Sequence, residues 1–357
     1  MRMIVAGGGT GGHLFPGLAV AEAASASGDA EVLFVGSAYG IEARAVPRTP
    51  FPFEALRIQG LRGRGLSGVL TFAWQLPAAV LRAWRIVGTF RPQVVVGLGG
   101  YGSVPVVLAA WLRGLPSVLL EQNARPGWAN RCLGRIARRV CTAFADSGSF
   151  FPAGKAIHTG NPVRQLASTL RPDPHHFTIF IFGGSQGARS INRAAVEAAR
   201  ILSTQMQGLR IIHQTGAADL QWVTEHYRDA GVAAEVHGFI DDMGDAYARA
   251  DVVICRAGAT TLAELAALAK PSILVPYPFA GGHQQANAME LARHGAAEVI
   301  GDTELTGERL AATIAAVAGD RARLEALAEA AGQLAVCDAT ARVVDVCRQV
   351  AAGGGRG

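Results

Sequence analysis

The sequence predicts an α/β protein made of two doubly wound parallel sheets. Short apolar runs rich in Val, Ile, Leu and Phe recur along the chain, and turns and alanine-rich stretches follow them. Continuous apolar strands that alternate with helices are typical of parallel sheets covered on both faces. The pattern restarts near the middle of the 357 residues, a length that exceeds one ordinary hydrophobic core. We therefore expect two Rossmann-like domains.

The expected strands are the apolar runs, and the residues that end each run are expected to form turns. In the first half these segments are MIVAGGG (3–9), EVLFVGS (31–37), QVVVGLGG (93–100) and SVLLEQN (117–123). In the second half they are FTIFIFGG (177–184), LRIIHQTG (209–216), AEVHGFI (234–240), DVVICRAG (251–258) and SILVPYP (272–278). The last alanine-rich stretch, roughly residues 321–350, is expected to be helical.

The seam between the two halves is expected near HTGNPVR (158–164), where a Gly-Asn-Pro sequence interrupts the strand and helix pattern. We place the first domain at residues 1–160 and the second at residues 161–335. Residues 336–357 are expected to form a C-terminal helix that packs back on the first domain.

Charge is distributed unevenly between the two halves. Residues 1–160 carry 16 Lys and Arg against 7 Asp and Glu, a net of +9, whereas residues 161–357 carry 17 against 21, a net of −4. Between Ala55 and Ala145 the only acid is Glu121, alongside twelve arginines. This asymmetry indicates an anionic partner for the first half.

Composition argues against several classes of protein. Half of the residues are hydrophobic and 17% are charged, which argues against disorder. No stretch reaches the roughly 20 apolar residues of a membrane span, and the N-terminus lacks the pattern of a signal peptide. The five cysteines form no C-x-x-C pair, so they suggest neither a disulfide framework nor a zinc site. We therefore expect a cytosolic protein.

Gly7, Gly9 and Gly12 match G-x-G-x-x-G, the fingerprint of a dinucleotide-binding fold. That fold also needs an acidic residue at the end of the second strand to bind the ribose diol. Here the second strand ends in Gly36 and Ser37, so the sequence argues against NAD binding. The turn instead offers backbone N–H groups at a helix N-terminus, where the helix dipole favours an anion.

Three more glycine-rich turns are expected at strand ends. One is GLGGYGSVP (97–105), and another is GGSQGA (183–188), which is expected to place Ser185 at the start of a helix. The third, in CRAGATTLAELAALAKP (255–271), opens a helix that carries Glu264. Because ligands bind at the carboxyl ends of strands in open α/β sheets, we expect these turns to converge on one cleft.

Eight motifs occur along residues 3–288 in a recognisable order. They are GGGTGGHLFPGLAVA, GLGGYGSVP, EQNARPGWANR, GNPVR, GGSQGA, GFIDDM, RAGATTLAELAALAKPSILVPYP and HQQANA. Each alone is weak evidence, but together they resemble the bacterial MurG family specifically. The resemblance implies a GT-B fold, in which two Rossmann-like domains face each other across a cleft.

The resemblance also implies an activity. Members of the family transfer N-acetylglucosamine from UDP-N-acetylglucosamine to the MurNAc 4-hydroxyl of lipid I with inversion, and the product, lipid II, serves peptidoglycan synthesis. The protein is then expected to bind peripherally to the anionic cytoplasmic face of the bacterial cell membrane, with cell-wall synthesis and division proteins as further partners. No cofactor or metal is expected, because helix N-termini, a serine and an arginine can neutralise the departing UDP.

The family pattern places the donor site mainly in the second domain. Glu264 is expected to accept hydrogen bonds from both ribose hydroxyls, and a surface helix glutamate is the alternative. Ile240 is expected to frame the uracil through its backbone, and Ser185 to reach a diphosphate oxygen. The other expected donor contacts are Ala259, Thr260, Thr261, Leu262 and Ala263 beneath the nucleotide, Arg164 at a phosphate or in a hinge salt bridge, Gln284 and Gln285 at sugar hydroxyls, and Thr10, Gly11, Gly12 and Asn123 over the sugar.

His13 is the expected catalytic base. Inverting transfer needs a group that accepts the proton of the attacking hydroxyl, and a histidine at a helix N-terminus has a lowered pKa that keeps it neutral at pH 7. A helix cap and a hydrogen-bond donor to the acceptor's phosphate stay open as alternatives. The chain departs from the family's commonest form at Leu120, where histidine is usual, and at Arg125, where an apolar residue is common. Both departures concern the acceptor side.

Residues 61–87 mix arginines with large apolar side chains. Such a mixture suits docking onto anionic lipid headgroups without spanning the bilayer, and a buried helix with a solvated arginine face is the alternative. The expected membrane-docking residues are Trp74, Arg82, Trp84 and Arg85. No nucleic-acid-binding module is recognisable, so nucleic acid is not an expected partner.

Three other functions stay open beside lipid I glycosylation. They are a related GT-B transferase acting on diacylglycerol or another lipid, a non-hydrolysing sugar epimerase, and a non-catalytic nucleotide-sugar sensor. The motifs GGTGGH and EQNARPGWANR favour lipid I as acceptor, because the donor motifs alone are shared more widely.

Overall fold

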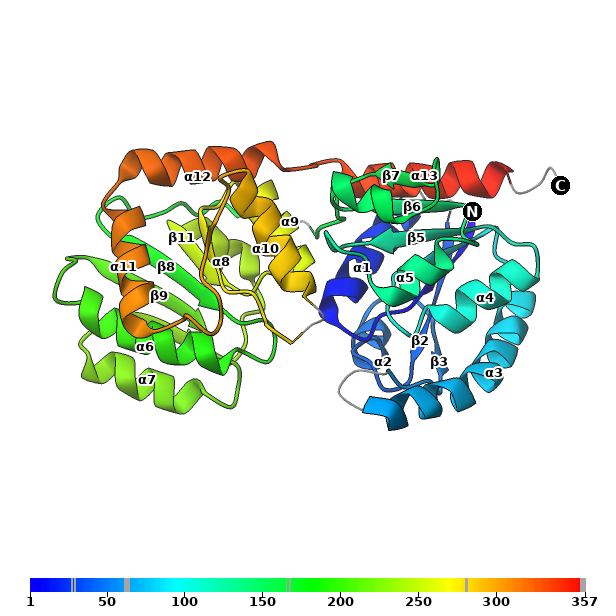
Figure 1. The fold of residues 1–357 in the computed structure, drawn as a ribbon, viewed down its shortest axis with the longest axis horizontal. Helices are drawn as coiled ribbons and strands as arrows, with labels where there is room; N and C mark the ends of the chain where they lie inside the picture. Colours follow the sequence, from blue (N-terminus) through cyan, green and yellow to red (C-terminus); the bar gives the residue numbers. More distant parts are fainter. Residues whose placement is uncertain are drawn as a thin grey trace. The chain divides into compact units, whose positions relative to one another are not determined.

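The computed structural model describes residues 1–26, 28, 30–60, 65–164, 166, 168–279 and 282–353, with only the backbone described for residues 65–70. The chain divides into two compact units (Figure 1). Unit 1 comprises Met1–Arg164 and Val336–Gly357, and unit 2 comprises Gln165–Ala335. The C-terminal segment thus belongs to the first unit.

Within the described residues, unit 1 contains a seven-stranded parallel sheet with the order β3-β2-β1-β4-β5-β6-β7. Its strands are β1 (Arg2–Ala6), β2 (Glu31–Ser37), β3 (Phe53–Leu56), β4 (Val94–Gly97), β5 (Ser117–Glu121), β6 (Arg139–Thr142) and β7 (Ala156–His158). In the central register Ile4 of β1 lies opposite Leu33 of β2 and Val95 of β4. Buried strands on both sides of β1 explain the uninterrupted apolar sequence of this segment.

Helices cover both faces of the unit 1 sheet. Because successive strand residues point to opposite faces, Met3 and Val5 pack with α1 and α13, whereas Ile4 and Ala6 pack with α3, α4 and α5. The described helices of this unit are α1 (Gly11–Ser25), α2 (Glu42–Ala45), α3 (Gly65–Phe90), α4 (Val104–Leu112), α5 (Trp128–Leu133) and α13 (Ala339–Gly353), with short 3₁₀ turns at Val46–Arg48 and Ala145–Phe150.

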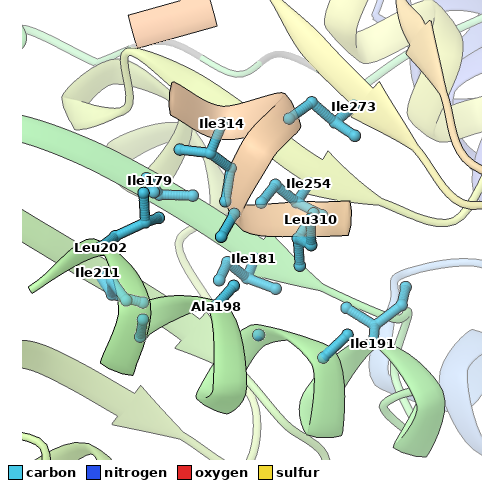
Figure 2. Packing of buried hydrophobic residues seen from close by; sticks show 14 of the residues in the cluster. Ile179, Ile181, Ile191, Ala198, Leu202, Ile211, Ile254, Ile273, Leu310 and Ile314 are labelled. Carbon is cyan, nitrogen blue, oxygen red and sulfur yellow. The ribbon is translucent and has the colours of Figure 1, made fainter. Parts of the chain in front are cut away.

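Unit 2 repeats this design with a parallel sheet of order β10-β9-β8-β11-β12-β13 among its described residues. The strands are β8 (Phe177–Phe182), β9 (Leu209–Gln214), β10 (Ala233–His237), β11 (Val252–Cys255), β12 (Ser272–Leu274) and β13 (Glu298–Val299). The helices are α6 (Arg189–Leu202), α7 (Leu220–Asp229), α8 (Met243–Arg249), α9 (Ala259–Ala267), α10 (His283–Arg293), α11 (Gly307–Ala318) and α12 (Arg321–Gln333). Figure 2 shows Ile181 and Ile254 of the sheet packed against Leu310 and Ile314 of α11.

Both sheets have the same topological switch point. In unit 1 the first strand, β1, lies between β2 and β4, and in unit 2 the first strand, β8, lies between β9 and β11. Strand order reverses there, so the turns after β1 and β4, and those after β8 and β11, border the crevice where doubly wound folds bind ligands. In the part of the chain that the structure describes, no helix is long and apolar enough to cross a membrane.

Candidate functional site

The glycine turn after β1 packs directly on the turn after β4. Gly7 has φ +116°, and a Cβ atom on it would lie 2.7 Å from the carbonyl oxygen of Gly99. A Cβ atom on Gly100 would lie 2.9 Å from the carbonyl oxygen of Gly8. Real Cβ atoms do not approach so closely, so glycine is required where the two backbones meet. The two turns form one glycine-lined surface at the switch point of unit 1.

The four residues expected over the sugar and at the acceptor open helix α1. Thr10 is the N-cap residue, its carbonyl accepts the N–H of His13 at 3.1 Å, and Gly11 and Gly12 are the first two helical residues. The His13 imidazole lies against the turn after β4, because a Cβ atom on Gly100 would be 3.3 Å from its Cδ2 atom. His13 therefore lies in the first helical turn rather than at the cap position.

Asn123 is held by a buried carboxylate at the end of β5. Glu121 is 2% exposed, and its Oε1 accepts the backbone N–H of Asn123 at 2.9 Å and the side-chain amide at 3.1 Å. Its Oε2 accepts the N–H of Gly127 and the side-chain amide of Asn130. Burial raises the pKa of Glu121, and these four donors act against the rise. Glu121 thus fixes the loop that carries Asn123.

Arg164, expected at a phosphate, lies beside the start of α1. Its guanidinium carbon is 5.7 Å from the centre of the Phe15 ring, which is the distance of a cation–π contact. Phe15 follows His13 by two positions in the same helix. The structure therefore brings the Arg164 charge to the helical turn that carries His13.

In unit 2, Ser185 occupies the glycine turn after β8 but not the start of a helix. The expectation of a helix beginning at this residue is wrong, because α6 starts at Arg189. Two glycines with positive φ shape the intervening turn, and Gly187 lies so close to the Thr215 carbonyl that a Cβ atom there would overlap it. Ser185 is exposed at the tip of this turn.

Gln214, at the end of β9, connects the Ser185 turn with the Ile240 loop. Its side-chain N–H donates to the Gly184 carbonyl at 2.9 Å, and its Oε1 accepts the backbone N–H of Ile240 at 2.8 Å. The Ile240 N–H is therefore already used inside the protein. Of the backbone groups of Ile240, the carbonyl is the one that can still bind a nucleobase donor.

Glu264 lies in the interior of unit 2, so the alternative of a surface helix glutamate is wrong. Its side chain is 4% exposed, and its Oε2 accepts the hydroxyl of Tyr247 at 3.0 Å. The Tyr247 hydroxyl, on α8, thus holds the carboxylate of Glu264 on α9.

The residues expected beneath the nucleotide form the first turns of α9. Gly258 is the N-cap residue with extended backbone, so the N-terminal N–H groups of the helix point to the carboxyl edge of β11. Burial separates these residues into two groups. The side chains of Ala259 and Leu262 are buried, and those of Thr260, Thr261 and Ala263 are half-buried.

The neighbouring glutamines of α10 point to different partners. Gln284 accepts the backbone N–H of Tyr277 through its Oε1 at 2.8 Å. Gln285 is exposed and lines a separate groove with Met289 of the same helix and Leu327 of α12. The structure therefore does not bring the two side chains to one point, and Gln284 is the one that borders the loop after β12.

The four residues expected at the membrane have different surroundings. Trp74 is 88% exposed, whereas Trp84 packs against the unit 1 core and the Arg113 guanidinium stacks on its ring at 4.2 Å. Arg82 pairs with Glu54 at 3.3 Å, and Arg85 is exposed. Trp84 is thus held as a structural residue. Arg62 and Arg64, in the same expected segment, lie outside the described residues.

Three supporting residues escaped the sequence analysis because their roles depend on contacts between distant segments. Gln214 and Tyr247 are described above, and Glu42, buried beside the first glycine turn, is the third. Their only sequence signals are a polar residue at the end of an apolar run and an acid after the second strand. Among the described residues no group of three or more His, Cys, Asp or Glu side chains is placed to hold a metal ion.

Comparisons with known proteins agree with this geometry. Residues 3–142 match the glycosyltransferase family 28 N-terminal domain, and residues 178–343 match the C-terminal domain of the same family. UDP-N-acetylglucosamine--N-acetylmuramyl-(pentapeptide) pyrophosphoryl-undecaprenol N-acetylglucosamine transferase from Myxococcus xanthus is 47% identical over 97% of this chain and 92% of its own length. The enzyme of the same name from an Anaeromyxobacter species is 46% identical over 98% of this chain and 93% of its own length.

A solved structure supports the same relationship. The crystal structure of Acinetobacter baumannii MurG superposes with a TM-score of 0.81 at 33% identity and covers 98% of this chain and 99% of its own. Three findings agree with one family assignment. They are the two parallel-sheet units, the matches to both domains of one glycosyltransferase family, and the sequence identity over nearly the full length of the chain. The chain belongs to the MurG family of GT-B glycosyltransferases.

Proposed function

We propose that the protein transfers N-acetylglucosamine from UDP-N-acetylglucosamine to the 4-hydroxyl of the MurNAc residue of lipid I, with inversion, to form lipid II. The observation that carries this proposal is identity of 46–47% to relatives of that name over 97–98% of the chain. The matched length extends over both units.

Unit 2 is proposed to bind the donor. The carboxylate of Glu264 accepts hydrogen bonds from the ribose diol, and the carbonyl of Ile240 accepts one from the uracil N–H. The N–H groups at the start of α9 and the hydroxyl of Ser185 bind the diphosphate, because the positive end of a helix dipole stabilises an anion. Gln284, held at Tyr277, contacts sugar hydroxyls.

Unit 1 is proposed to supply the catalytic base and the acceptor side. His13 accepts the proton of the MurNAc 4-hydroxyl. The hydroxyl oxygen forms a bond to the anomeric carbon of the donor sugar, and the bond between that carbon and the UDP oxygen breaks. UDP leaves with the bonding electron pair, and the Arg164 guanidinium offsets part of its charge. Asn123, fixed by Glu121, and the residues from Thr10 to Gly12 position the transferred sugar.

The proposed membrane contact is one face of α3. Trp74, Leu81 and Arg85 are spaced by seven and four residues, so they share a side of the helix, and all three are exposed. An exposed tryptophan, a leucine and a cation suit the anionic lipid–water interface. We propose that this face docks on the cytoplasmic surface of the cell membrane, where cell-wall synthesis and division proteins assemble.

The membrane proposal has a matched pair of variants within one helix. Trp74→Ser should lower binding to phosphatidylglycerol vesicles in a sedimentation assay and leave the melting temperature unchanged, because Trp74 is 88% exposed. Trp84→Ser should lower the melting temperature, because Trp84 packs against the core. Unchanged vesicle binding by Trp74→Ser would rule out this face as the docking surface.

Incubation with UDP-N-acetylglucosamine and a water-soluble lipid I analogue tests the proposed reaction. UDP release matched one to one by a β-linked disaccharide product is the expected result. Absence of product with the lipid I analogue, together with turnover on diacylglycerol, would replace the proposal with the related lipid glycosyltransferase.

A further inference from the structure

Glu42, the first residue of the short helix α2, places its carboxylate inside the glycine turn of unit 1. The residue is 1% exposed. Its Oε2 accepts the backbone N–H of Gly9 at 2.6 Å, and its Oε1 accepts that of Ser37 at 2.9 Å. Hydrogen bonds to an ionised acceptor are shorter and about twice as strong as those between neutral groups. One side chain thus joins the turn after β1 to the end of β2.

Three glycines leave room for this carboxylate. A Cβ atom on Gly8 would lie 2.6 Å from Oε2 of Glu42, and one on Gly36 would lie 2.7 Å from its Cγ atom. A Cβ atom on Gly40 would also overlap the carboxylate. Side chains at these positions would displace Glu42, so the surrounding backbone is shaped around it. Part of the glycine pattern that resembles a nucleotide fingerprint therefore encloses an internal acid.

We infer that Glu42 is a positioning residue that supplies the anion of the unit 1 glycine turn and thereby holds the start of α1 in place. Gly9 immediately precedes Thr10, the N-cap residue, so a bond at the Gly9 N–H fixes the backbone one residue before the helix that carries His13. The kinetic part of this inference rests on the proposed function, whereas the structural part does not.

The internal anion also determines what this turn can bind. The Gly9 N–H is already bonded to a negative charge, and a phosphate placed at the same group would be repelled by that charge. The diphosphate of the donor is therefore directed away from Gly9, toward the helix N-termini of unit 2. The first turn instead presents a fixed backbone surface to the reacting sugar.

Two conservative variants and a matched control test the inference. Glu42→Gln keeps the shape of the side chain but turns an NH₂ group toward one of the two N–H donors. Glu42→Asp keeps the charge but is one methylene too short to span both. The control is Glu31→Gln, which makes the same chemical change in the exposed ion pair with Arg2 on the same sheet.

The expected result combines kinetics with a local structural readout. Displacement of a catalytic group by about 1 Å can cost about 100-fold in rate, so kcat with the water-soluble acceptor should fall about 10- to 100-fold in both Glu42 variants. The dissociation constant of UDP should stay within twofold by calorimetry. Amide hydrogen exchange at Gly9 and Ser37, followed by NMR, should accelerate at least tenfold in Glu42→Gln and not in Glu31→Gln.

Chemical rescue gives a second, independent readout. Glu42→Ala leaves a carboxylate-sized space with the Gly9 and Ser37 N–H groups directed into it. Sodium formate should raise kcat of this variant in a saturable way, whereas sodium chloride at the same ionic strength should not. Equal effects of formate and chloride would contradict the inference.

If Glu42→Gln leaves both kcat and the amide exchange of Gly9 unchanged, the inference that Glu42 positions the glycine turn is overturned. If the wild-type protein shows no transfer to lipid I, the proposed function fails, but the exchange experiment still decides the role of Glu42. The two failures are therefore distinguishable.

Discussion

The glycine turns after β1 and β8 occupy equivalent places in the two sheets but are held by different groups. In unit 1 the carboxylate of Glu42 accepts the N–H of Gly9. In unit 2 the neutral amide of Gln214 donates to the carbonyl of Gly184, and Gly187 packs on the backbone of Thr215, the residue after β9. A charged side chain thus bonds to the donors of the first turn, whereas an uncharged one bonds to an acceptor of the second.

This difference bears on which ligands the two similar glycine turns can bind. A turn that contains its own anion has little remaining affinity for phosphate and acts as a rigid support for neighbouring side chains. A turn braced by a neutral amide keeps the positive potential of its N–H groups for a ligand. We therefore propose chemistry at the first turn and anion binding at the second, and each proposal can be tested.

His13→Ala should have the largest effect, because it removes the proposed base from the first turn. General-base assistance contributes about 10²–10⁴ in rate, so kcat should fall by that factor while UDP affinity, which we propose unit 2 provides, stays unchanged. Steady-state kinetics and calorimetry on the same preparation measure both quantities.

The pH–rate profile provides the control for His13→Ala. The wild-type rate should fall on an acidic limb as the imidazole becomes protonated, and the variant should lack that limb. Near-normal kcat with a lowered melting temperature would instead show that His13 only stabilises the helix, and the first turn would lose its catalytic assignment.

Acid should weaken the second turn through a buried histidine. His213 of β9 contacts the Tyr227 hydroxyl and Asn192, whose amide donates to the Thr215 carbonyl beside Gln214. Burial lowers the pKa of His213 to about 3, with Asp219 acting in the opposite direction. The unfolded chain binds this proton near pH 6.5 and the folded unit does not, so stability present above pH 6.5 is lost as the pH falls below it.

Between pH 6.5 and 4.5 the free energy of unfolding of unit 2 should fall by about 2 to 3 kcal/mol, since one pH unit corresponds to about 1.4 kcal/mol. Urea titration followed by fluorotryptophan NMR can report this, because Trp222 is the one tryptophan in the sequence of unit 2. His213→Gln should abolish the pH dependence in this range. An unchanged slope in that variant would assign the acid sensitivity to another group.

Glu264→Ala should weaken donor binding without affecting the first turn. Loss of hydrogen bonds to a charged group costs about 1.5–3 kcal/mol, or roughly 10- to 100-fold in the dissociation constant of UDP. Calorimetry measures this change, and Glu225→Ala, at a half-buried glutamate of α7 that accepts a hydrogen bond from Gln221, is the matched control in the same unit. Equal UDP affinity in both variants would remove Glu264 from the ribose site.

The fold was predictable from sequence because it depends on local patterns. The apolar runs at the centre of each sheet became strands, since buried parallel strands need continuous apolar residues. The place of Ser185 was not predictable, because the turn geometry that delays α6 to Arg189 comes from packing on Gly216 of another segment. Helix starts depend on such contacts as well as on local sequence.

The side chain that holds the first turn could not be predicted from the sequence for the same reason. The sequence shows no acid at the end of β2, the position that the dinucleotide arrangement requires. It does not show that Glu42, five residues beyond Ser37, returns to the turn from α2. Likewise Trp84 resembles an interfacial tryptophan until Arg113, 29 residues later, stacks on it. Both contacts join segments that are distant in sequence.

Gln214→Glu would place a carboxylate beside the second turn, as Glu42 does at the first, and we expect the smallest effect from this variant. The new carboxylate still accepts the Ile240 N–H, but it no longer donates to the Gly184 carbonyl, and it brings a negative charge beside the turn of Ser185. Coulomb repulsion across several ångströms of partly solvated protein is about 0.5–1 kcal/mol, or roughly two- to fivefold in affinity. The affinity for UDP should fall by that factor in calorimetry, and the affinity for uridine should hardly change, because uridine carries no phosphate.

Gln214→Leu, which loses the Ile240 bond without adding charge, is the control and should lower the affinity for both ligands equally. If Gln214→Glu also lowers UDP and uridine affinity by the same factor, the second turn is not the diphosphate site, and the difference between the two turns is one of structure alone.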